Sequence, residues 1–151
     1  MNAQELLIQQ TEKQIAQLFA VARRLPADKL DWKPAPGARS ALCQLQEVAT
    51  ALPIFWQIYT DRKLDWDPGK MAAWVEERSK LTTLDELEAV AKENTRKLAE
   101  FIRELDPEHL TDSVELPFPG ERNMADVLGY HFWNASYHEG QITYIESLLA
   151  E

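Results

Sequence analysis

The sequence predicts an all-α protein, a four-helix bundle with a long connection between its second and third helices. Three observations support this fold class. Four long stretches repeat apolar residues at intervals of three and four, which is typical of helices that bury one face. Helix-capping residues and prolines lie at the ends of these stretches, where helices should begin and end. A long segment with aromatic residues separates the second stretch from the third. We expect an antiparallel-type bundle and a single domain over residues 1–151.

The first helix is predicted over residues 3–25, and Pro26 ends its pattern. The connection over residues 27–39 is rich in proline and is expected to be a stiff loop. The buried face of this helix should carry Ile8, Thr11, Ile15, Leu18, Ala22 and Leu25.

The second helix should begin after Ser40, whose side chain is a suitable N-cap, and run to about residue 60. Pro53 lies inside this helix and has no N–H to donate. It is therefore expected to kink the helix or to leave a carbonyl near residue 49 without its helical partner. One face of the helix is an apolar stripe made of Leu42, Leu45, Ala49, Leu52 and Trp56.

Beyond the second helix, we expect a turn over residues 67–69 and a short helix over residues 71–78. Thr83 and Glu86 form a capping-box pattern that predicts the start of the third helix, over residues 84–105. Asn94 falls in the middle of its apolar face and is an unusual polar residue there.

Residues 114–120 are too short and too rich in proline for more than an edge strand or an extended loop. The last helix is predicted over residues 124–151, with Asn123 as its cap. Its inward face includes two of the three histidines of the chain. The face consists of Leu128, His131, Ala135, His138, Ile142, Ile145 and Leu149.

The net charge of −9 argues against nucleic acid as a partner, because phosphate binding needs a basic surface. Cys43 is the only cysteine, so the chain has no internal disulfide. We find no signal-peptide core and no apolar run of about 20 residues. A cytoplasmic protein without membrane association is therefore predicted.

Two segments together resemble the DinB-like (damage-inducible) four-helix bundle superfamily: residues 30–40 (LDWKPAPGARS) and residues 137–142 (YHEGQI). The resemblance extends over nearly the whole chain through the helix order, the proline-rich first loop and the long second connection. It implies a bundle that often carries a three-histidine site for a divalent metal such as nickel or zinc. Some members are thiol-dependent transferases or isomerases, and dimers are frequent.

Carried over to this chain, the resemblance places the metal-ligand positions at Glu47, Asn134 and His138. Only one of the three expected imidazoles is present. A carboxylate, an amide oxygen and one imidazole form a poor set for zinc or nickel, so at most weak recruitment of a divalent metal is predicted. His131 lies two turns before His138, roughly 10 Å along the helix axis, and cannot easily share an ion with it.

Two alternatives do not need a metal. Glu47 and His138 could form a buried ion pair or hydrogen bond, with Asn134 as a neutral bridge. Alternatively, Glu47 is simply solvated, because the apolar stripe of its helix faces the other way. Cys43 is either a thiol near the pocket or a small core residue, and the second is favoured.

Other residues near these positions are open to two interpretations. Trp133 and Tyr137 could line the mouth of a pocket, although aromatic residues on helices belong more often to a core or an interface. Gly140 is expected to permit close approach of a neighbouring helix. His109 follows a helix end and is expected at the surface.

The function that follows is the binding of an unidentified small molecule in a pocket between the second and last helices. Any chemistry there would be that of a weakly metal-dependent hydrolase or a thiol transferase, with His138 as base or ligand and Glu47 as its partner. The alternative is a non-catalytic binding protein or structural homodimer that has lost the metal site. Such a homodimer could associate through the apolar stripe of the second helix. Whether the chain is an enzyme remains open at this stage.

Overall fold

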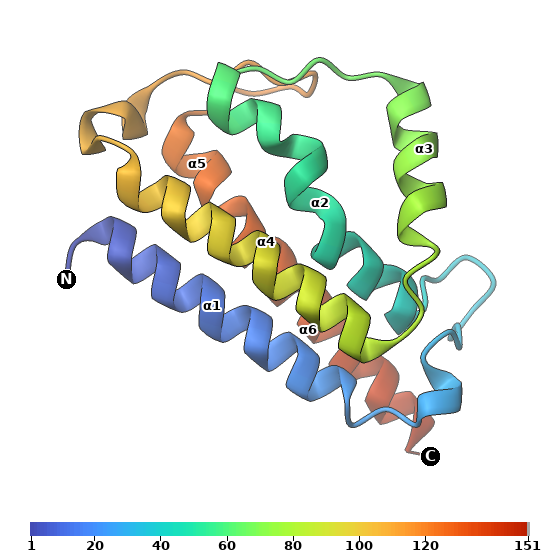
Figure 1. The fold of residues 1–151 in the computed structure, drawn as a ribbon. Coiled ribbons are helices and arrows are strands. Elements are labelled where there is room, and N and C mark those ends of the chain that lie inside the picture. The colour runs from blue at the N-terminus through green and yellow to red at the C-terminus, as the bar shows by residue number, and fades with distance from the viewer. Residues whose placement is uncertain (151) are drawn as a thin grey trace.

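The four long helices predicted from the sequence form the bundle in a computed structural model, which describes residues 1–150 (Figure 1). Within these residues the regular secondary structure is all helical, and loops joined at two isolated β-bridges connect the helices. The fold class is therefore confirmed. The helices are α1 (Ala3–Ala22), η1 (Ala27–Lys29), α2 (Ala41–Asp61), α3 (Pro68–Arg78), α4 (Leu84–Glu104), η2 (Pro107–Thr111), α5 (Met124–Leu128) and α6 (Tyr130–Leu149).

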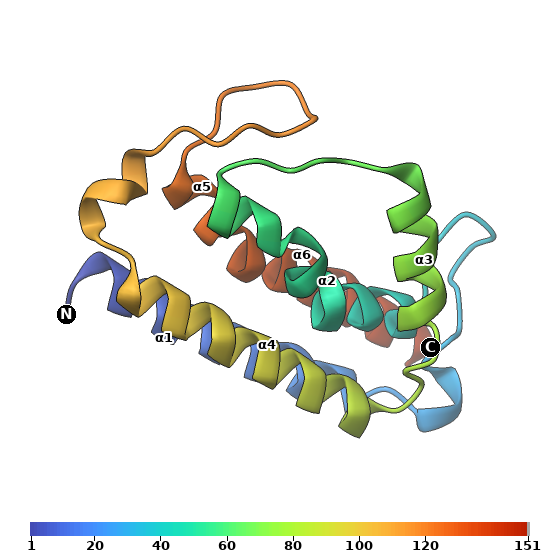
Figure 2. The same ribbon diagram turned by 45° about the horizontal axis from the view of Figure 1, so that its top comes forward.

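The order of the helices around the bundle differs from their order in the chain. α1 packs between α4 and α6, and α2 packs between the same two helices on the opposite side. Figures 1 and 2 show that α1 and α6 run in the same direction, as do α2 and α4. The expectation of antiparallel neighbours was therefore wrong for these two pairs. The connection through α3 returns the chain to the end at which α2 began, so α4 starts parallel to α2.

Most helix limits agree with the sequence pattern, and the differences have local causes. α1 ends at Ala22, three residues early, because its last carbonyls close in tight turns with Arg23, Arg24 and Leu25. Asp67 does not open a turn but caps α3, since its side chain accepts the Gly69 N–H at 2.8 Å.

The last predicted helix is divided into α5 and α6 at Gly129, a residue that disfavours a helix interior. Its cap was predicted correctly, because Asn123 and Asp126 form a reciprocal capping box. The same is true of Thr83 and Glu86 at the start of α4. The prediction for residue 151 lies outside the described residues.

The proline inside α2 is matched by the polar residue inside α4. Pro53 cannot donate to the carbonyl of Ala49, and Asn94 Nδ2 donates to that carbonyl instead, at 2.8 Å. Asn94 is buried, with 8% of its surface exposed. The prediction of a free carbonyl near residue 49 is thus confirmed, and the polar residue in the third helix has a structural reason.

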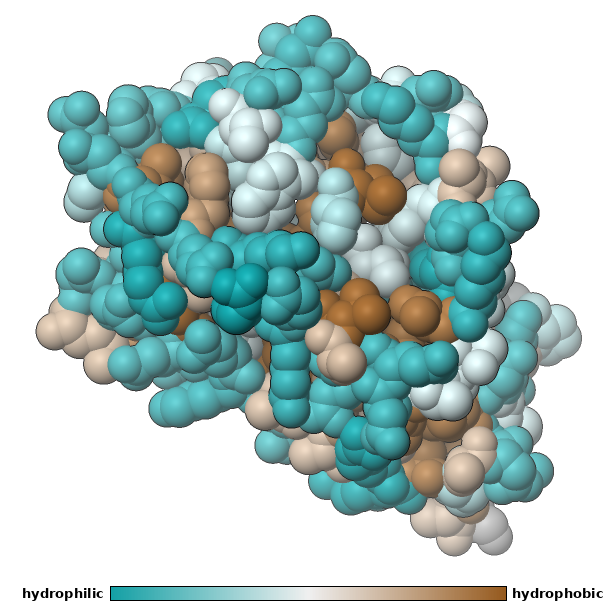
Figure 3. All heavy atoms as spheres, viewed as in Figure 1, coloured by the Kyte–Doolittle hydropathy of each residue, from teal (hydrophilic) through white to brown (hydrophobic). Residues whose placement is uncertain are grey.

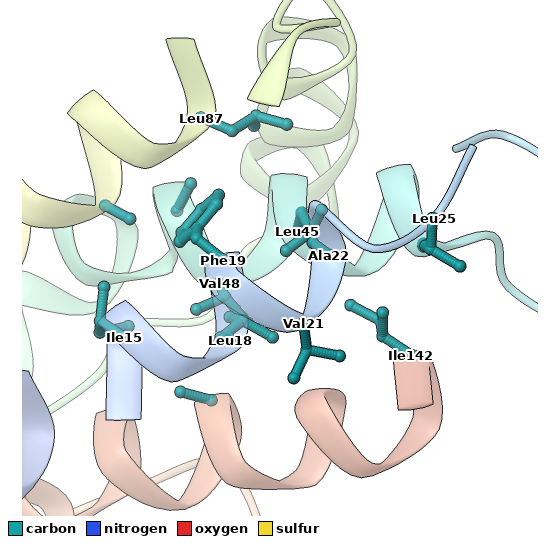
Figure 4. Packing of buried hydrophobic residues seen from close by; sticks show 14 of the residues in the cluster. Ile15, Leu18, Phe19, Val21, Ala22, Leu25, Leu45, Val48, Leu87 and Ile142 are labelled. Atoms are coloured by element: carbon teal, nitrogen blue, oxygen red, sulfur yellow. The ribbon is translucent and has the colours of Figure 1, made fainter. Parts of the chain in front are cut away.

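The core lies where the four long helices converge. Figure 4 shows Leu18 and Phe19 of α1 packed with Leu45 of α2, Leu87 of α4 and Ile142 of α6. Hydrophilic residues cover most of the face formed by α1 and α4, with small apolar patches between them (Figure 3). Among residues 1–150, none of the helices combines the length and the apolar character that crossing a membrane requires.

The stripe proposed for self-association is part of this core. Leu45 and Ala49 are fully buried within the chain itself, and Leu52 is 4% exposed. They cannot also form a contact between two copies. The choice of this surface was wrong, because the stripe faces α4 and the rest of the bundle. The dimer itself stays a prediction.

Candidate functional site

His138 lies at the centre of a buried polar cluster between α2 and α6. Only 1% of its surface is exposed. Its Nδ1 lies 2.8 Å from Gln44 Oε1 and 3.3 Å from Gln141 Oε1, while its Nε2 lies 3.2 Å from Glu47 Oε1. Each ring nitrogen therefore faces an oxygen.

The hydrogen-bond network assigns the roles of the two nitrogens. Gln44 Nε2 donates to the Arg39 carbonyl at 3.4 Å, so the other amide atom, Oε1, must face His138. Because this oxygen can only accept, Nδ1 carries a proton. An Nδ1–H held by an amide oxygen leaves Nε2 directed at Glu47, and this orientation is common for histidines that bind metals through Nε2.

Glu47 is held from two sides. Its Oε1 faces His138, and its Oε2 accepts from Arg39 Nη2 at 2.7 Å. Burial raises the pKa of this carboxyl, but the His138 hydrogen bond and the Arg39 charge outweigh burial and lower the pKa to about 2. The carboxylate is therefore ionised. The interpretation of Glu47 as a merely solvated residue was wrong, since only 20% of its side chain is exposed.

Asn134 lies one turn before His138 on the same helix and is 2% exposed. Within residues 1–150, its Nδ2 is a buried donor without a hydrogen-bond partner. The predicted bridge from Asn134 to Glu47 and His138 is not formed. A buried unpaired donor costs about 1–3 kcal/mol, and a bound molecule with an acceptor atom would remove that cost.

These residues do not fit a tightly held zinc or nickel ion. Both oxygens of Glu47 are engaged, one by the cationic guanidinium of Arg39, which repels a metal at the same carboxylate. Asn134 offers an amide, which is a weak ligand for these metals. No group of three or more His, Cys, Asp or Glu side chains in the described chain could hold an ion.

His131 is separate from this cluster, as its spacing predicted. It is also 1% exposed, and its Nε2 lies 3.0 Å from Thr95 Oγ1. The Thr95 hydroxyl donates to the Ala91 carbonyl at 2.7 Å, so it accepts from the imidazole. Burial lowers the pKa of His131 to about 4. His131 is therefore a neutral part of the core.

Three residues of the cluster were missed by the sequence analysis: Arg39, Gln44 and Gln141. Arg39 and Gln141 both belong to the segments that carry the family resemblance. Arg39 also immediately precedes the N-cap of α2, which places it within reach of the first turns of that helix. Gln44 lies one turn before Glu47, so both side chains point towards α6. Helical spacing from Glu47 would have identified it.

Cys43 is half-buried, and its carbonyl accepts from Arg39 Nη2 at 3.2 Å. Gly140 does not serve close packing, because a Cβ there would meet no atom within 4 Å. That prediction was wrong: Gly140 is exposed and lines a groove of about 580 Å³ beside Tyr137. His109 is exposed, as predicted.

An aromatic pocket of about 400 Å³ opens between α2, the loop after it, the 113–122 segment and the start of α6, while Arg39, Gln44 and Gln141 of the polar cluster line the groove of about 580 Å³. Tyr130, in its lining, lies about two turns before His138 on α6. Burial raises the pKa of its hydroxyl, and the charge of Glu47 raises it further. The lining includes Phe55, Tyr59, Phe118, Arg122, Tyr130 and Trp133.

Trp133 and Tyr137 lie at the surface rather than in the core, with 54% and 51% of their surfaces exposed. Their rings stack at a centroid distance of 5.4 Å, and Tyr130 packs on Trp133 at 5.6 Å. Of the two earlier interpretations, a place at the mouth of the pocket fits Trp133, which lines it.

Comparisons with known proteins identify a family and similar folds. A family model described as the DinB superfamily matches residues 10–142. Among solved structures, the chain is similar to YfiT from Bacillus subtilis, with 16% identity, a TM-score of 0.81 and coverage of 99% of this chain and 90% of that one. YfiT is described as a probable metal-dependent hydrolase with an unusual four-helix bundle topology.

A second similar structure is the DinB-like protein YjoA, also from Bacillus subtilis. It has 15% identity and a TM-score of 0.65, and the match covers 97% of this chain and 93% of that one. At such identities the likeness shows the fold alone. The comparison with curated proteins gave no match.

Proposed function

The chain belongs to the DinB superfamily, and from that premise we propose that it binds a small organic molecule in the cleft between α2 and α6. The polar centre of the proposed site is the Glu47–His138 pair, held by Arg39 and Gln44. The aromatic pocket receives the apolar part of the ligand. The observations that carry this proposal are the buried polar cluster and, about two turns before His138 on α6, a pocket of about 400 Å³ lined by Tyr130, within the usual range for small-molecule sites.

Asn134 supports the same position for the ligand. Its unpaired Nδ2 lies one turn from His138 and one turn from Tyr130, between the polar cluster and the aromatic pocket. A ligand with a carbonyl or carboxylate oxygen would satisfy this donor. The ligand thus has an acceptor at its polar end.

Any reaction at this site, such as hydrolysis or thiol transfer, would be catalysed by proton transfer to and from the protein. Nδ1 donates to Gln44 and Nε2 donates to the ionised Glu47, so His138 Nε2 can take a proton from water or from a thiol only after it has given up the proton that it shares with Glu47. The Glu47 carboxylate must first move from Nε2, since it occupies the position of the proton donor. A tightly bound zinc or nickel ion is not required, because the donor set does not suit one.

A screen of fragments by ligand-observed NMR tests the proposal on untagged protein. We expect acceptor-bearing fragments that bind the wild type, bind Glu47→Gln or Asn134→Leu at least fivefold more weakly, and bind the surface control Lys13→Gln unchanged. Both cleft variants keep the shape of the residue they replace, so folding should persist. Fragments that bind all four proteins equally would place the site elsewhere.

Elemental analysis of the same preparation tests the absence of a tight metal. We expect well below one equivalent of nickel or zinc per chain. A stoichiometric metal that disappears in His138→Ala would overturn the metal-independent form of the proposal and favour a metal-dependent hydrolase.

A non-catalytic homodimer is a second candidate, and one observation favours it. Tyr130, Trp133, Tyr137 and Tyr144 form an exposed aromatic stripe on α6, with Tyr144 65% exposed. Such stripes are enriched in interfaces between chains. Light scattering during size exclusion measures the mass directly, and a monomer at micromolar concentration would exclude a stable homodimer.

A further inference from the structure

The aromatic pocket contains one arginine that has no charged or aromatic partner among residues 1–150. Of the chain's eight arginines, six form ion pairs with carboxylates and Arg78 lies over the Trp74 ring. The remaining one is Arg122, which lines the pocket. Within residues 1–150, its side-chain hydrogen bond goes to the neighbouring Glu121 carbonyl at 2.8 Å. Arg122 is exposed at the pocket, so its guanidinium is accessible both to solvent and to a ligand in the apolar lining.

The one acidic residue of the pocket lining does not neutralise Arg122. Asp126 accepts the Asn123 backbone N–H at 2.9 Å as part of the cap of α5, and no ion pair joins it to Arg122 in the described chain. Asp126 keeps its negative charge, and its hydrogen bond holds the carboxylate at the helix start. Arg122 is the one basic side chain of the pocket lining.

The rest of the lining suits a planar apolar group. Phe118 and Trp133 are each 54% exposed at the pocket, and burial of these rings under a ligand would be favourable. Phe55 stacks on Trp66 at 6.1 Å with nearly parallel planes, and Trp66 meets Phe118 at 6.2 Å. The aromatic side chains of α2 and of the two loops thus support one another around a preformed apolar space.

From these observations we infer that the pocket binds an amphipathic carboxylate: an aromatic ring or short apolar chain that ends in a single anionic group. The ring lies among Phe55, Phe118 and Trp133, and the carboxylate pairs with Arg122 in the two-point geometry that guanidinium favours. This inference rests on the proposed function, because it names the ligand class of the same cleft. The volume of about 400 Å³ suits one ring with a short side chain.

Three probes with the same apolar body and different charges test this inference by isothermal titration calorimetry: 4-phenylbutyrate, 4-phenylbutanol and 4-phenylbutylamine. We expect 4-phenylbutyrate to bind wild type at least tenfold more tightly than the amine, with the alcohol between them. Arg122→Gln should reduce binding of 4-phenylbutyrate at least tenfold and leave the alcohol within twofold. Arg24→Gln, at the other end of the bundle, is the matched control and should change neither.

Phe118→Ala separates the apolar contribution from the charge. Because Phe118 is an exposed loop residue, its loss should leave folding intact and weaken all three probes by a similar factor. Equal or tighter binding of the amine would overturn the inference and identify the pocket as a cage for cations. Preference for 4-phenylbutyrate that survives in Arg122→Gln would overturn the role of Arg122.

The probes also distinguish this inference from the proposed function. If 4-phenylbutyrate binds with the expected charge preference and Glu47→Gln has no effect, the aromatic pocket is a ligand site and the polar centre is not part of it. If none of the probes binds at 10 mM while other fragments depend on Glu47, the cleft is functional and the ligand class is wrong.

Discussion

His131 and His138 lie on one helix, two turns apart, and each has 1% of its surface exposed, yet their surroundings differ. His131 has the Thr95 hydroxyl as its hydrogen-bond partner and is otherwise in the core, where burial lowers its pKa to about 4. His138 faces Glu47, Gln44 and Gln141. Burial and helix face are the same, so the partners on the facing helices determine what each imidazole can do.

The difference shows why a position on the inward face of a helix is, by itself, weak evidence for a functional site. The partner of His131 comes from α4, which contributes a hydroxyl that is also tied to its own backbone. The partners of His138 come from α2 and from α6 itself, and they include an ionised carboxylate. One histidine completes the core, while the other belongs to a charged network.

The largest expected effect is a loss of protein stability in acid, caused by protonation of His131. Its pKa is about 4 in the folded state and about 6.5 in the unfolded state, so protonation favours unfolding. Stability should be complete above about pH 6.5 and should fall by about 3 kcal/mol as the pH drops through 4. Urea titrations across this range measure the loss.

Two variants locate this effect. His131→Leu should flatten the dependence between pH 6.5 and 4, whereas Glu47→Gln should retain it. The pKa of Glu47 is lowered to about 2, so its contribution is lost only below about pH 4.5. The same slope in His131→Leu and wild type would mean that His131 is not a neutral core residue.

The second prediction concerns a double variant that places imidazoles at the two other metal-ligand positions beside His138. Glu47→His with Asn134→His should raise zinc affinity at least a hundredfold over wild type, about 2.7 kcal/mol, because three imidazoles suit zinc. Competition with a chelating dye measures it. His138→Ala in this background should abolish the gain and His131→Leu should not. No gain would show that positions 47, 134 and 138 do not converge.

The third prediction compares the hydrogen bonds of the two rings. Thr95→Val removes the acceptor of a buried imidazole N–H and should cost about 2 kcal/mol of unfolding free energy. Gln44→Leu should cost less than about 1 kcal/mol, because Gln141 Oε1 lies 3.3 Å from the same nitrogen. Chemical denaturation of both variants tests the order, and a larger loss in Gln44→Leu would reverse the comparison.

The smallest effect concerns Arg39. Arg39→Met removes the cation beside Glu47 and should strengthen weak zinc binding by roughly three- to tenfold, about 1 kcal/mol, with Arg24→Met as the control. Calorimetric titration with zinc gives the affinities. Unchanged affinity would mean that the chemistry of Asn134, rather than the Arg39 charge, limits metal binding.

The sequence was sufficient for the helices because their caps and prolines are local signals. Ser40, Thr83 and Asn123 each cap the helix that they were expected to cap. The parallel pairing of α1 with α6 could not be predicted, because periodicity shows which face is buried and not which helix covers it.

The same limit applied to the candidate site. The family pattern placed Glu47 near His138, and their contact follows from it. The role of Arg39 required the path of the proline-rich loop, which spacing does not give. The free donor of Asn134 and the unpaired charge of Arg122 are properties of side-chain surroundings, so they appear only when every neighbour is in place.

The pairing of α1 with α6 also affects how the chain is made. α1 is synthesised before α6, and an extensive part of its packing surface contacts α6. Until residues 130–149 emerge, α1 and α2 keep an apolar face open to water, and the cleft has only one of its walls. Domains generally complete folding as units, so this bundle should close only once α6 is available to pack. Truncation before α6 should therefore yield an aggregating fragment rather than a smaller bundle.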